Sequence, residues 1–169
     1  MVAVGAAGLL VGWIARGDGD STATATITRP TPRRAAVGLP AAVERTRGAV
    51  QHAAATRNYA ALRRLVPRSG FTYSYGAPAK GDTVAYWRRL EGDGQRPLET
   101  LAKILELPYS LRQGLYVWPF AYGLPRGELT RYERILLGPL ARSYAGDDYY
   151  GWRTGIRPDG RWQFFVAGD

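Results

Sequence analysis

The C-terminal stretch gives the clearest structural signal in the chain: Tyr149-Tyr-Gly-Trp-Arg-Thr-Gly-Ile156, Arg-Pro-Asp-Gly160, Arg-Trp-Gln-Phe-Phe-Val-Ala167. Two runs rich in aromatic and β-branched residues flank Pro-Asp-Gly, which is a typical tight-turn sequence. We therefore expect two antiparallel strands that form the last hairpin of a sheet.

Helical patterns precede this hairpin. Apolar residues recur at helical spacing from Leu39 to about Thr56. Asn58 and Asp82 each stand where a helix N-cap is expected, and Thr130 with Glu133 has the spacing of a capping box. The predicted helices cover residues 39–56, 59–66, 83–90 and 97–106, with a last helix from Leu129 to Gly138.

Two further segments are predicted to be strands. Phe71-Thr-Tyr-Ser-Tyr75 alternates large rings with small hydroxyl side chains, which is the period of a strand that buries one face. Gly114–Tyr122 is aromatic and β-branched, and Pro119 confines it to an edge, an end or a bulge. The pattern predicts an α+β fold, in which an N-terminal membrane segment precedes helices packed on a curved antiparallel sheet closed by the C-terminal hairpin.

The first fifteen residues carry no charge and end before Arg16. Fifteen apolar residues are short for a membrane span and long enough for a signal-peptide core, so both interpretations stay open beside that of a buried helix. A basic region before the run and a good cleavage motif are both missing, which favours an uncleaved anchor.

The chain divides into a membrane anchor or signal at 1–16, a Thr/Pro/Arg-rich linker at 17–38 and a single α+β domain at 39–169. The Thr-rich linker resembles the spacers that follow single membrane anchors of exported bacterial proteins. That resemblance implies an extracytoplasmic domain at the cell membrane, or a secreted one if the segment is cleaved. Arginines after the anchor argue weakly for the cytoplasmic side.

Composition limits the chemistry. The chain has no cysteine, which removes disulfides, thiolate catalysis and the common structural zinc sites, so we expect no metal site and no cofactor. The net charge is +9, and residues 29–68 supply most of it with nine Arg against one Glu. We expect this basic region to contact an anionic surface of the envelope through Arg29, Arg33, Arg34, Arg45 and Arg47.

Few residues suggest catalysis. His52 is the single histidine and lies in an Ala-rich helix, where a surface or packing role is favoured. Asp147 and Asp148 could share a proton as an acid/base pair, but adjacent residues at a strand start point to opposite faces. Arg153 lies within an aromatic strand, so it either faces outward or, if inward, requires a carboxylate or an acidic ligand. We predict no catalytic residue.

Aromatic residues give the stronger functional signal, because they exceed what a core of this size needs. Rings either fill that core or line a concave site, where Tyr and Trp also supply polar groups. The residues predicted to bind a ligand are Tyr73, Tyr75, Trp87, Trp118, Trp152 and Arg153.

A family resemblance points the same way. Arg57-Asn-Tyr-Ala-Ala-Leu-Arg-Arg-Leu-Val followed by Phe71-Thr-Tyr-Ser-Tyr-Gly is similar to the opening of nuclear-transport-factor-2-like (SnoaL-like) domains, and Gly155–Asp169 is similar to their last hairpin. The C-terminal block also resembles that of bacterial membrane-anchored exported proteins. The resemblance implies a cone-shaped sheet with a pocket, and no particular reaction.

These observations favour a membrane-tethered extracytoplasmic domain that binds a ligand or a protein partner through an aromatic pocket or face. The expected partners are the lipid bilayer through residues 1–15, and anionic envelope components or another membrane protein. One alternative is a small isomerase-like or dehydratase-like pocket enzyme, which requires a carboxylate or histidine at the pocket floor. The least favoured alternative is nucleic-acid binding through Arg29–Arg68.

Overall fold

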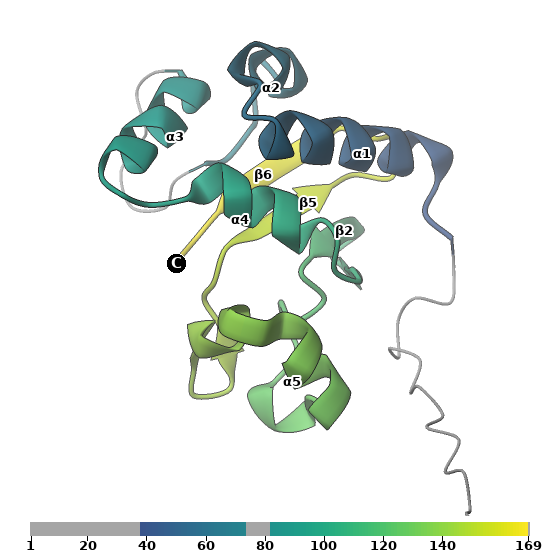
Figure 1. The fold of residues 1–169 in the computed structure, drawn as a ribbon. Helices are drawn as coiled ribbons and strands as arrows, with labels where there is room; N and C mark the ends of the chain where they lie inside the picture. The colour runs from purple at the N-terminus through teal and green to yellow at the C-terminus, as the bar shows by residue number, and fades with distance from the viewer. Residues whose placement is uncertain (1–37, 74–81, 169) are drawn as a thin grey trace, which may run out of the picture.

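The computed structural model describes residues 38–73 and 82–168 and has an α+β fold (Figure 1). Its α-helices are α1 (Ala41–Ala55), α2 (Tyr59–Leu65), α3 (Thr83–Gly92), α4 (Pro97–Ile104) and α5 (Arg131–Leu137). Two 3₁₀ helices, η1 (Arg126–Glu128) and η2 (Gly138–Ser143), flank α5. No helix in this part of the chain is both long and apolar enough to cross a bilayer, and the predicted segment at residues 1–15 lies outside it.

The main sheet is antiparallel, with the order β1-β2-β5-β6. Its strands are β1 (Ser110–Arg112), β2 (Leu115–Trp118), β5 (Arg153–Ile156) and β6 (Trp162–Val166). The C-terminal hairpin is therefore confirmed as β5 and β6. Pro119 follows the last residue of β2, as its missing N–H requires.

The predicted helix starts are confirmed. The side chain of Asn58 accepts a hydrogen bond from Ala61 N at 2.9 Å, and Asp82 accepts one from Val84 N at 2.9 Å. Thr130 and Glu133 form a complete capping box at the start of α5. These side chains satisfy backbone N–H groups that the first turn of a helix leaves without partners.

Helices α1 and α4 lie side by side over one face of the sheet (Figure 1). The core on this side is aromatic: the ring centroids of Trp87 and Trp162 are 5.8 Å apart, and those of Trp87 and Phe165 are 5.7 Å apart. Trp118 from β2 is 1% exposed in the same core. Trp162 donates its indole N–H to Thr154 Oγ1 at 2.7 Å, so the buried donor has a partner.

The turn between β5 and β6 is fixed to the start of α1. Thr46 Oγ1 donates a hydrogen bond to the Gly160 carbonyl at 2.7 Å. Gly160 has φ +87°, and a Cβ there would lie 2.8 Å from the Ala42 carbonyl oxygen. Glycine is therefore required at this position both for its backbone conformation and for its close approach to the helix.

Residues 119–152 form an insertion between β2 and β5, which pair directly with each other. The insertion contains η1, α5, η2 and a small hairpin, β3 (Tyr144–Ala145) with β4 (Asp148–Tyr149). It has its own small core, with Phe120, Leu129, Leu137, Tyr144 and Tyr149 among its buried members. In Figure 1 it lies at the opposite end of the molecule from α2.

The predicted strand Phe71–Tyr75 is not a regular strand in the part that the structure describes, residues 71–73. Only Thr72 forms a β-bridge, parallel to β6 at Phe164, while Phe71 and Tyr73 pack half-buried against the main core. The ring of Phe71 lies 4.8 Å from that of Trp162. The alternation of rings and hydroxyls therefore reflects packing against neighbouring aromatics. Tyr75 lies outside the described residues.

Candidate functional site

A pocket of about 700 Å³ lies between the second face of the sheet and the insertion. The sheet contributes side chains from β1, β2, β5 and β6, and the insertion contributes Tyr122, Gly123, Asp148, Tyr149 and Tyr150. Such a volume falls within the range of small-molecule sites. We call it the sheet–insertion pocket.

The sheet side of this pocket is built by one row of cross-strand neighbours. Val117 pairs with Gly155, and Gly155 pairs with Phe164, so their side chains share a face. The alternate residues of β2, Tyr116 and Trp118, point to the opposite face of the sheet. They face the helices and belong to the main core. Because Gly155 has no side chain, the Phe164 ring lies across its Cα and provides a flat apolar surface.

Arg153 is buried at the pocket with 5% of its surface exposed. Its Nη1 donates to the Gly151 carbonyl at 3.2 Å, and its Nη2 donates to the Gly168 carbonyl at 2.7 Å. The guanidinium carbon lies 5.0 Å from the centre of the Tyr122 ring, within cation–π range. The inward alternative for Arg153 is therefore the correct one, and backbone carbonyls and a ring hold its charge in place.

Arg112 brings a second guanidinium to the pocket from the edge strand β1. Its Nη2 donates to the Gly123 carbonyl, whereas its buried Nε has no hydrogen-bond partner among the described residues. A Cβ at Gly123 would lie 2.9 Å from that Nε. The insertion thus packs directly on the guanidinium, which keeps donor capacity for another acceptor.

The insertion supplies tyrosines to the facing wall. Tyr149 is buried, and its hydroxyl donates to the Trp152 carbonyl at 3.3 Å. Burial raises the pKa of Tyr149 above its usual value. Among the described lining residues the one carboxylate is Asp148, and it is exposed.

The lining residues are suited to binding. Arg112 and Arg153 line the pocket together with the rings of Tyr122 and Phe164, and this set of side chains matches an anion carried on an apolar body. The enzyme alternative requires a carboxylate or histidine at the floor. The buried lining residues include Val117, Tyr149 and Arg153, whereas His52 is exposed on α1.

Of the five predicted ligand residues that the structure describes, Arg153 alone lines this pocket, and Tyr75 lies outside the described residues. Trp87 and Trp118 are fully buried in the main core, and Trp152 stacks on Phe165 at 4.7 Å between centroids. Tyr73 packs against Tyr86 at 5.3 Å. Arg112, Tyr122 and Phe164 are not among the predicted ligand residues, because assigning them requires knowing which face of the sheet the helices cover and where the insertion packs.

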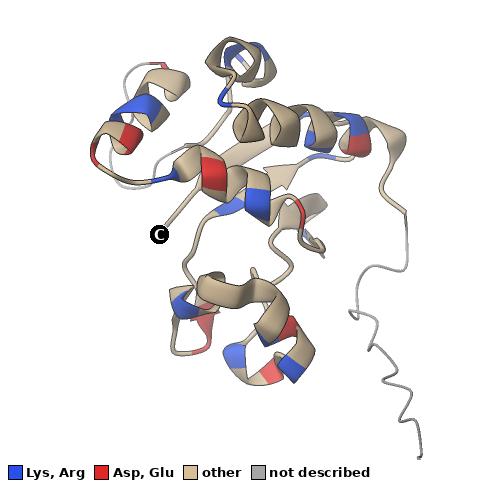
Figure 2. Cartoon of the chain, viewed as in Figure 1, with Lys and Arg blue, Asp and Glu red and all other residues tan. Residues whose placement is uncertain are grey.

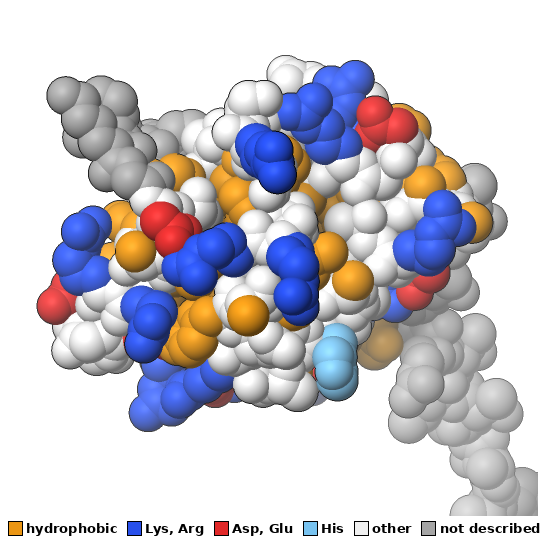
Figure 3. All heavy atoms as spheres, turned by 90° about the horizontal axis from the view of Figure 1, so that it is seen from above, with side chains coloured by type: hydrophobic (Ala, Val, Ile, Leu, Met, Phe, Trp, Pro, Cys, Tyr) orange, Lys and Arg blue, Asp and Glu red, His pale blue; other side chains and the backbone are white. Residues whose placement is uncertain are grey.

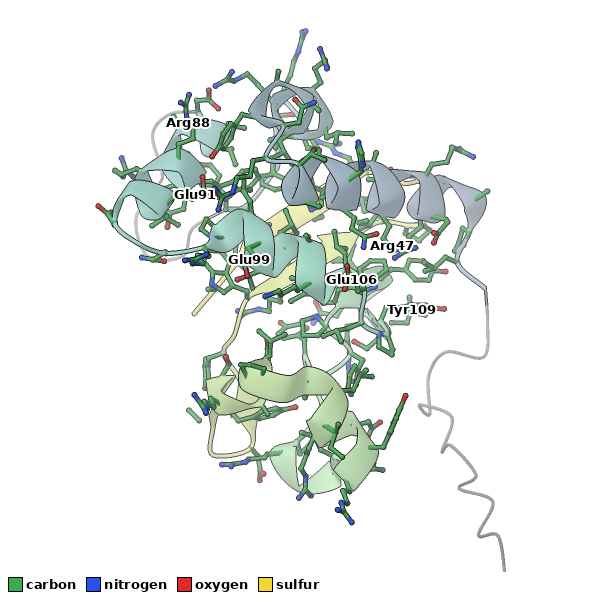
Figure 4. The ribbon with its side chains drawn as sticks, in the orientation of Figure 1. Arg47, Arg88, Glu91, Glu99, Glu106 and Tyr109 are labelled. Atoms are coloured by element: carbon green, nitrogen blue, oxygen red, sulfur yellow. The ribbon has the colours of Figure 1, made fainter. Side chains whose placement is uncertain are left out.

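The described residues that were predicted to contact an anionic surface, Arg45 and Arg47, have different environments. Arg45 is exposed on α1, whereas Arg47 donates to both Glu44 oxygens and to the Leu105 carbonyl at 2.8 Å, which ties α1 to the end of α4 (Figure 4). The hydrogen bonds from Arg47 lower the pKa of Glu44. Arg29, Arg33 and Arg34 lie outside the described residues.

A second cavity of about 420 Å³ lies between α4 and the insertion. Leucines dominate its lining, including Leu107, Leu136 and Leu140, and Lys103 and Glu106 are its charged residues. It has no buried charged group to orient a ligand. The sheet–insertion pocket is therefore the better candidate.

Comparison with known proteins identifies no relative of this chain. No protein-family model, no curated protein and no solved structure matches the chain.

Proposed function

We propose that this chain is a membrane-tethered, extracytoplasmic binding domain whose sheet–insertion pocket holds a small organic anion with a flat apolar body. The observation that carries the proposal is the placement of Arg112 and buried Arg153 beside Tyr122 and Phe164 in one concavity. Arginine suits this task because its planar group binds carboxylate or phosphate oxygens and also stacks on rings.

Support for the tether comes from the sequence alone. Residues 1–15 are uncharged and apolar, and a polar Thr/Pro/Arg-rich linker separates them from the folded part. Because the chain contains no cysteine, a single Thr24→Cys substitution gives one reactive site in that linker. Labelling of intact cells by a membrane-impermeant thiol reagent supports the extracytoplasmic location. Labelling only after lysis contradicts it.

Probe binding tests the pocket. We expect benzoate and phenyl phosphate to perturb NMR signals of the full-length chain in nanodiscs at Leu115 and Val117, whereas benzamidine, of similar shape and opposite charge, does not. Arg112→Gln should weaken benzoate binding by about tenfold or more, since a hydrogen bond to a charged group contributes about 1.5–3 kcal/mol. Arg142→Gln, on an exposed arginine outside the pocket lining, is the matched control.

Equal responses to benzoate and benzamidine would contradict the proposed anion preference. A benzoate affinity that Arg112→Gln leaves unchanged would remove the pocket from the proposal.

A further inference from the structure

Exposed arginines gather where α2 and α3 meet. Arg64 lies on α2, Arg68 follows that helix, and Arg88 and Arg89 lie on α3. We call these four residues the α2–α3 basic face. Figure 3 views the molecule from this side, and basic side chains outnumber acidic ones on the surface that it shows.

Contacts between the two helices hold this face together. The Arg88 guanidinium carbon lies 5.0 Å from the centre of the Tyr59 ring on α2, and the Tyr59 hydroxyl donates to Glu91 on α3. Arg63 Nε donates to Asp82 Oδ2 at 2.8 Å, which joins α2 to the start of α3. The position of Arg88 therefore follows from the packing of α3 against α2 (Figure 4).

The neighbouring carboxylates do not neutralise the face. Asp82 pairs with Arg63, and Glu91 lies 4.0 Å from Arg57. None of the four arginines of the α2–α3 basic face forms an ion pair with another described residue. Asp93, at the end of α3, is the remaining carboxylate of this region. The charge distribution along the ribbon is drawn in Figure 2.

We infer that the α2–α3 basic face docks on the anionic phospholipid headgroups of the bilayer that holds the chain. The inference rests on the proposed tether. The linker predicted at residues 17–38 contains 22 residues, and a random chain of this length has a root-mean-square span of about 25 Å, which is short enough to keep the domain close to the headgroups. Exposed arginines are attracted to such a surface over about a Debye length.

Docking in this way sets the orientation of the pocket. The insertion lies at the opposite end of the molecule from α2 (Figure 1). With α2 and α3 against the headgroups, the insertion points away from the bilayer. The insertion wall of the sheet–insertion pocket then lies on the side of the domain that faces solution.

Two single-cysteine variants measure this orientation in the full chain. Ala60→Cys places a label on exposed α2, and Ile135→Cys places one on α5, where Ile135 is 69% exposed. Each labelled chain is reconstituted in phosphatidylcholine vesicles with or without phosphatidylglycerol, with a nitroxide quencher on the headgroups. We expect phosphatidylglycerol to increase quenching at position 60 only, and 1 M salt, with a Debye length of about 3 Å, to abolish the increase.

Charge reversal provides the matched comparison. Arg64→Glu with Arg88→Glu should remove the lipid-dependent quenching at position 60, since each basic residue near an anionic surface contributes roughly a fivefold factor. Arg126→Glu with Arg131→Glu, on exposed positions of the insertion, should leave it unchanged. Equal quenching of position 60 with both lipid compositions, or stronger quenching at position 135, would overturn the inference.

Two further readouts separate the causes of failure. Flotation with pure phosphatidylcholine vesicles reports the tether alone. If the chain floats only with anionic vesicles, and Arg64→Glu with Arg88→Glu prevents this, the docking face stands and the tether fails. If the chain floats with neither the phosphatidylcholine vesicles nor the anionic vesicles, both the tether and the docking face are contradicted. Binding of a duplex oligonucleotide that requires Arg64 and Arg88, without lipid-dependent quenching, would assign the face to nucleic acid instead.

Discussion

Phe164 lies across Gly155, its cross-strand neighbour, and contributes its ring to the apolar lining of the sheet–insertion pocket. A Cβ at position 155 would lie 2.7 Å from Phe164 Cζ, which is closer than packed carbon atoms approach. The missing side chain at Gly155 therefore determines where the ring lies.

Gly155→Ala should destabilise the chain by about 1–3 kcal/mol, because the ring must move away from a well-packed position. In the Phe164→Val background the same substitution should cost much less, and urea unfolding of the four proteins measures the difference. Gly48→Ala is the control, since a Cβ there meets nothing within 4 Å and helix propensity predicts a gain of up to about 1 kcal/mol. Equal costs in both backgrounds would show that Phe164 does not cause the effect.

Thr154 joins the two strands of the C-terminal hairpin through its hydroxyl. The hydroxyl accepts from Trp162 Nε1 and donates to the Phe164 carbonyl, each at 2.7 Å. Thr154→Val keeps the shape but leaves a buried indole N–H unpaired, which should cost about 1–3 kcal/mol in urea unfolding. Thr154→Ser keeps the hydroxyl and should cost less. Similar losses for the two variants would contradict this role.

Tyr144 makes the insertion sensitive to alkaline pH. Its hydroxyl donates to the carbonyls of Ala121 and Leu124, and burial raises its pKa to about 12. Since the unfolded pKa is about 10, the stabilisation is fully present below pH 10 and is lost as the pH rises from about 10 to about 12. Tyr144→Phe should lower stability at neutral pH and reduce the alkaline slope of the unfolding free energy. An unchanged slope would exclude Tyr144 as its source.

Asp82 acts in the opposite pH range. A hydrogen bond from Arg63 lowers the pKa of this carboxyl, so its stabilisation is present above the unfolded pKa of about 3.9 and is lost as the pH falls through the folded pKa. Asp82→Asn keeps the helix cap, removes the acid dependence and should cost less than about 1 kcal/mol at pH 7. Asp82→Ala should cost about 1 kcal/mol more than Asp82→Asn in urea unfolding. Equal costs would mean that the cap contributes nothing.

Helix starts and the last hairpin could be predicted because local chemistry determines them. Asn58, Asp82 and Thr130 each bond to backbone N–H groups within three residues along the chain. Pro158-Asp159-Gly160 likewise forms its turn from local preferences. No knowledge of distant packing is needed for these elements.

The pocket could not be predicted because strand periodicity does not say which face is covered. Val117 and Trp118 are both buried, yet Val117 lines the pocket and Trp118 lies under the helices. Both faces of β2 are apolar, so the sequence offers the two alternatives equally. Most of the aromatic residues predicted to bind a ligand therefore lie in or against the main core.

Strand β1 was missed for a reason of turn chemistry. Gln113 and Gly114 join β1 to β2 with φ of 49° and 76°, which is the two-residue turn usually encoded by Asn-Gly. Glutamine at the first position removes the usual signal. The membrane segment and the nuclear-transport-factor-2-like resemblance stay predictions.

The most direct test of the pocket is to locate 4-fluorobenzoate on the full-length chain by intermolecular nuclear Overhauser effects to assigned methyl groups. We expect contacts to the methyl groups of Leu115 and Val117, which line the sheet–insertion pocket. Contacts confined to Leu136 and Leu140 would place the probe in the second cavity and contradict the assignment, as would the absence of contacts to any methyl group.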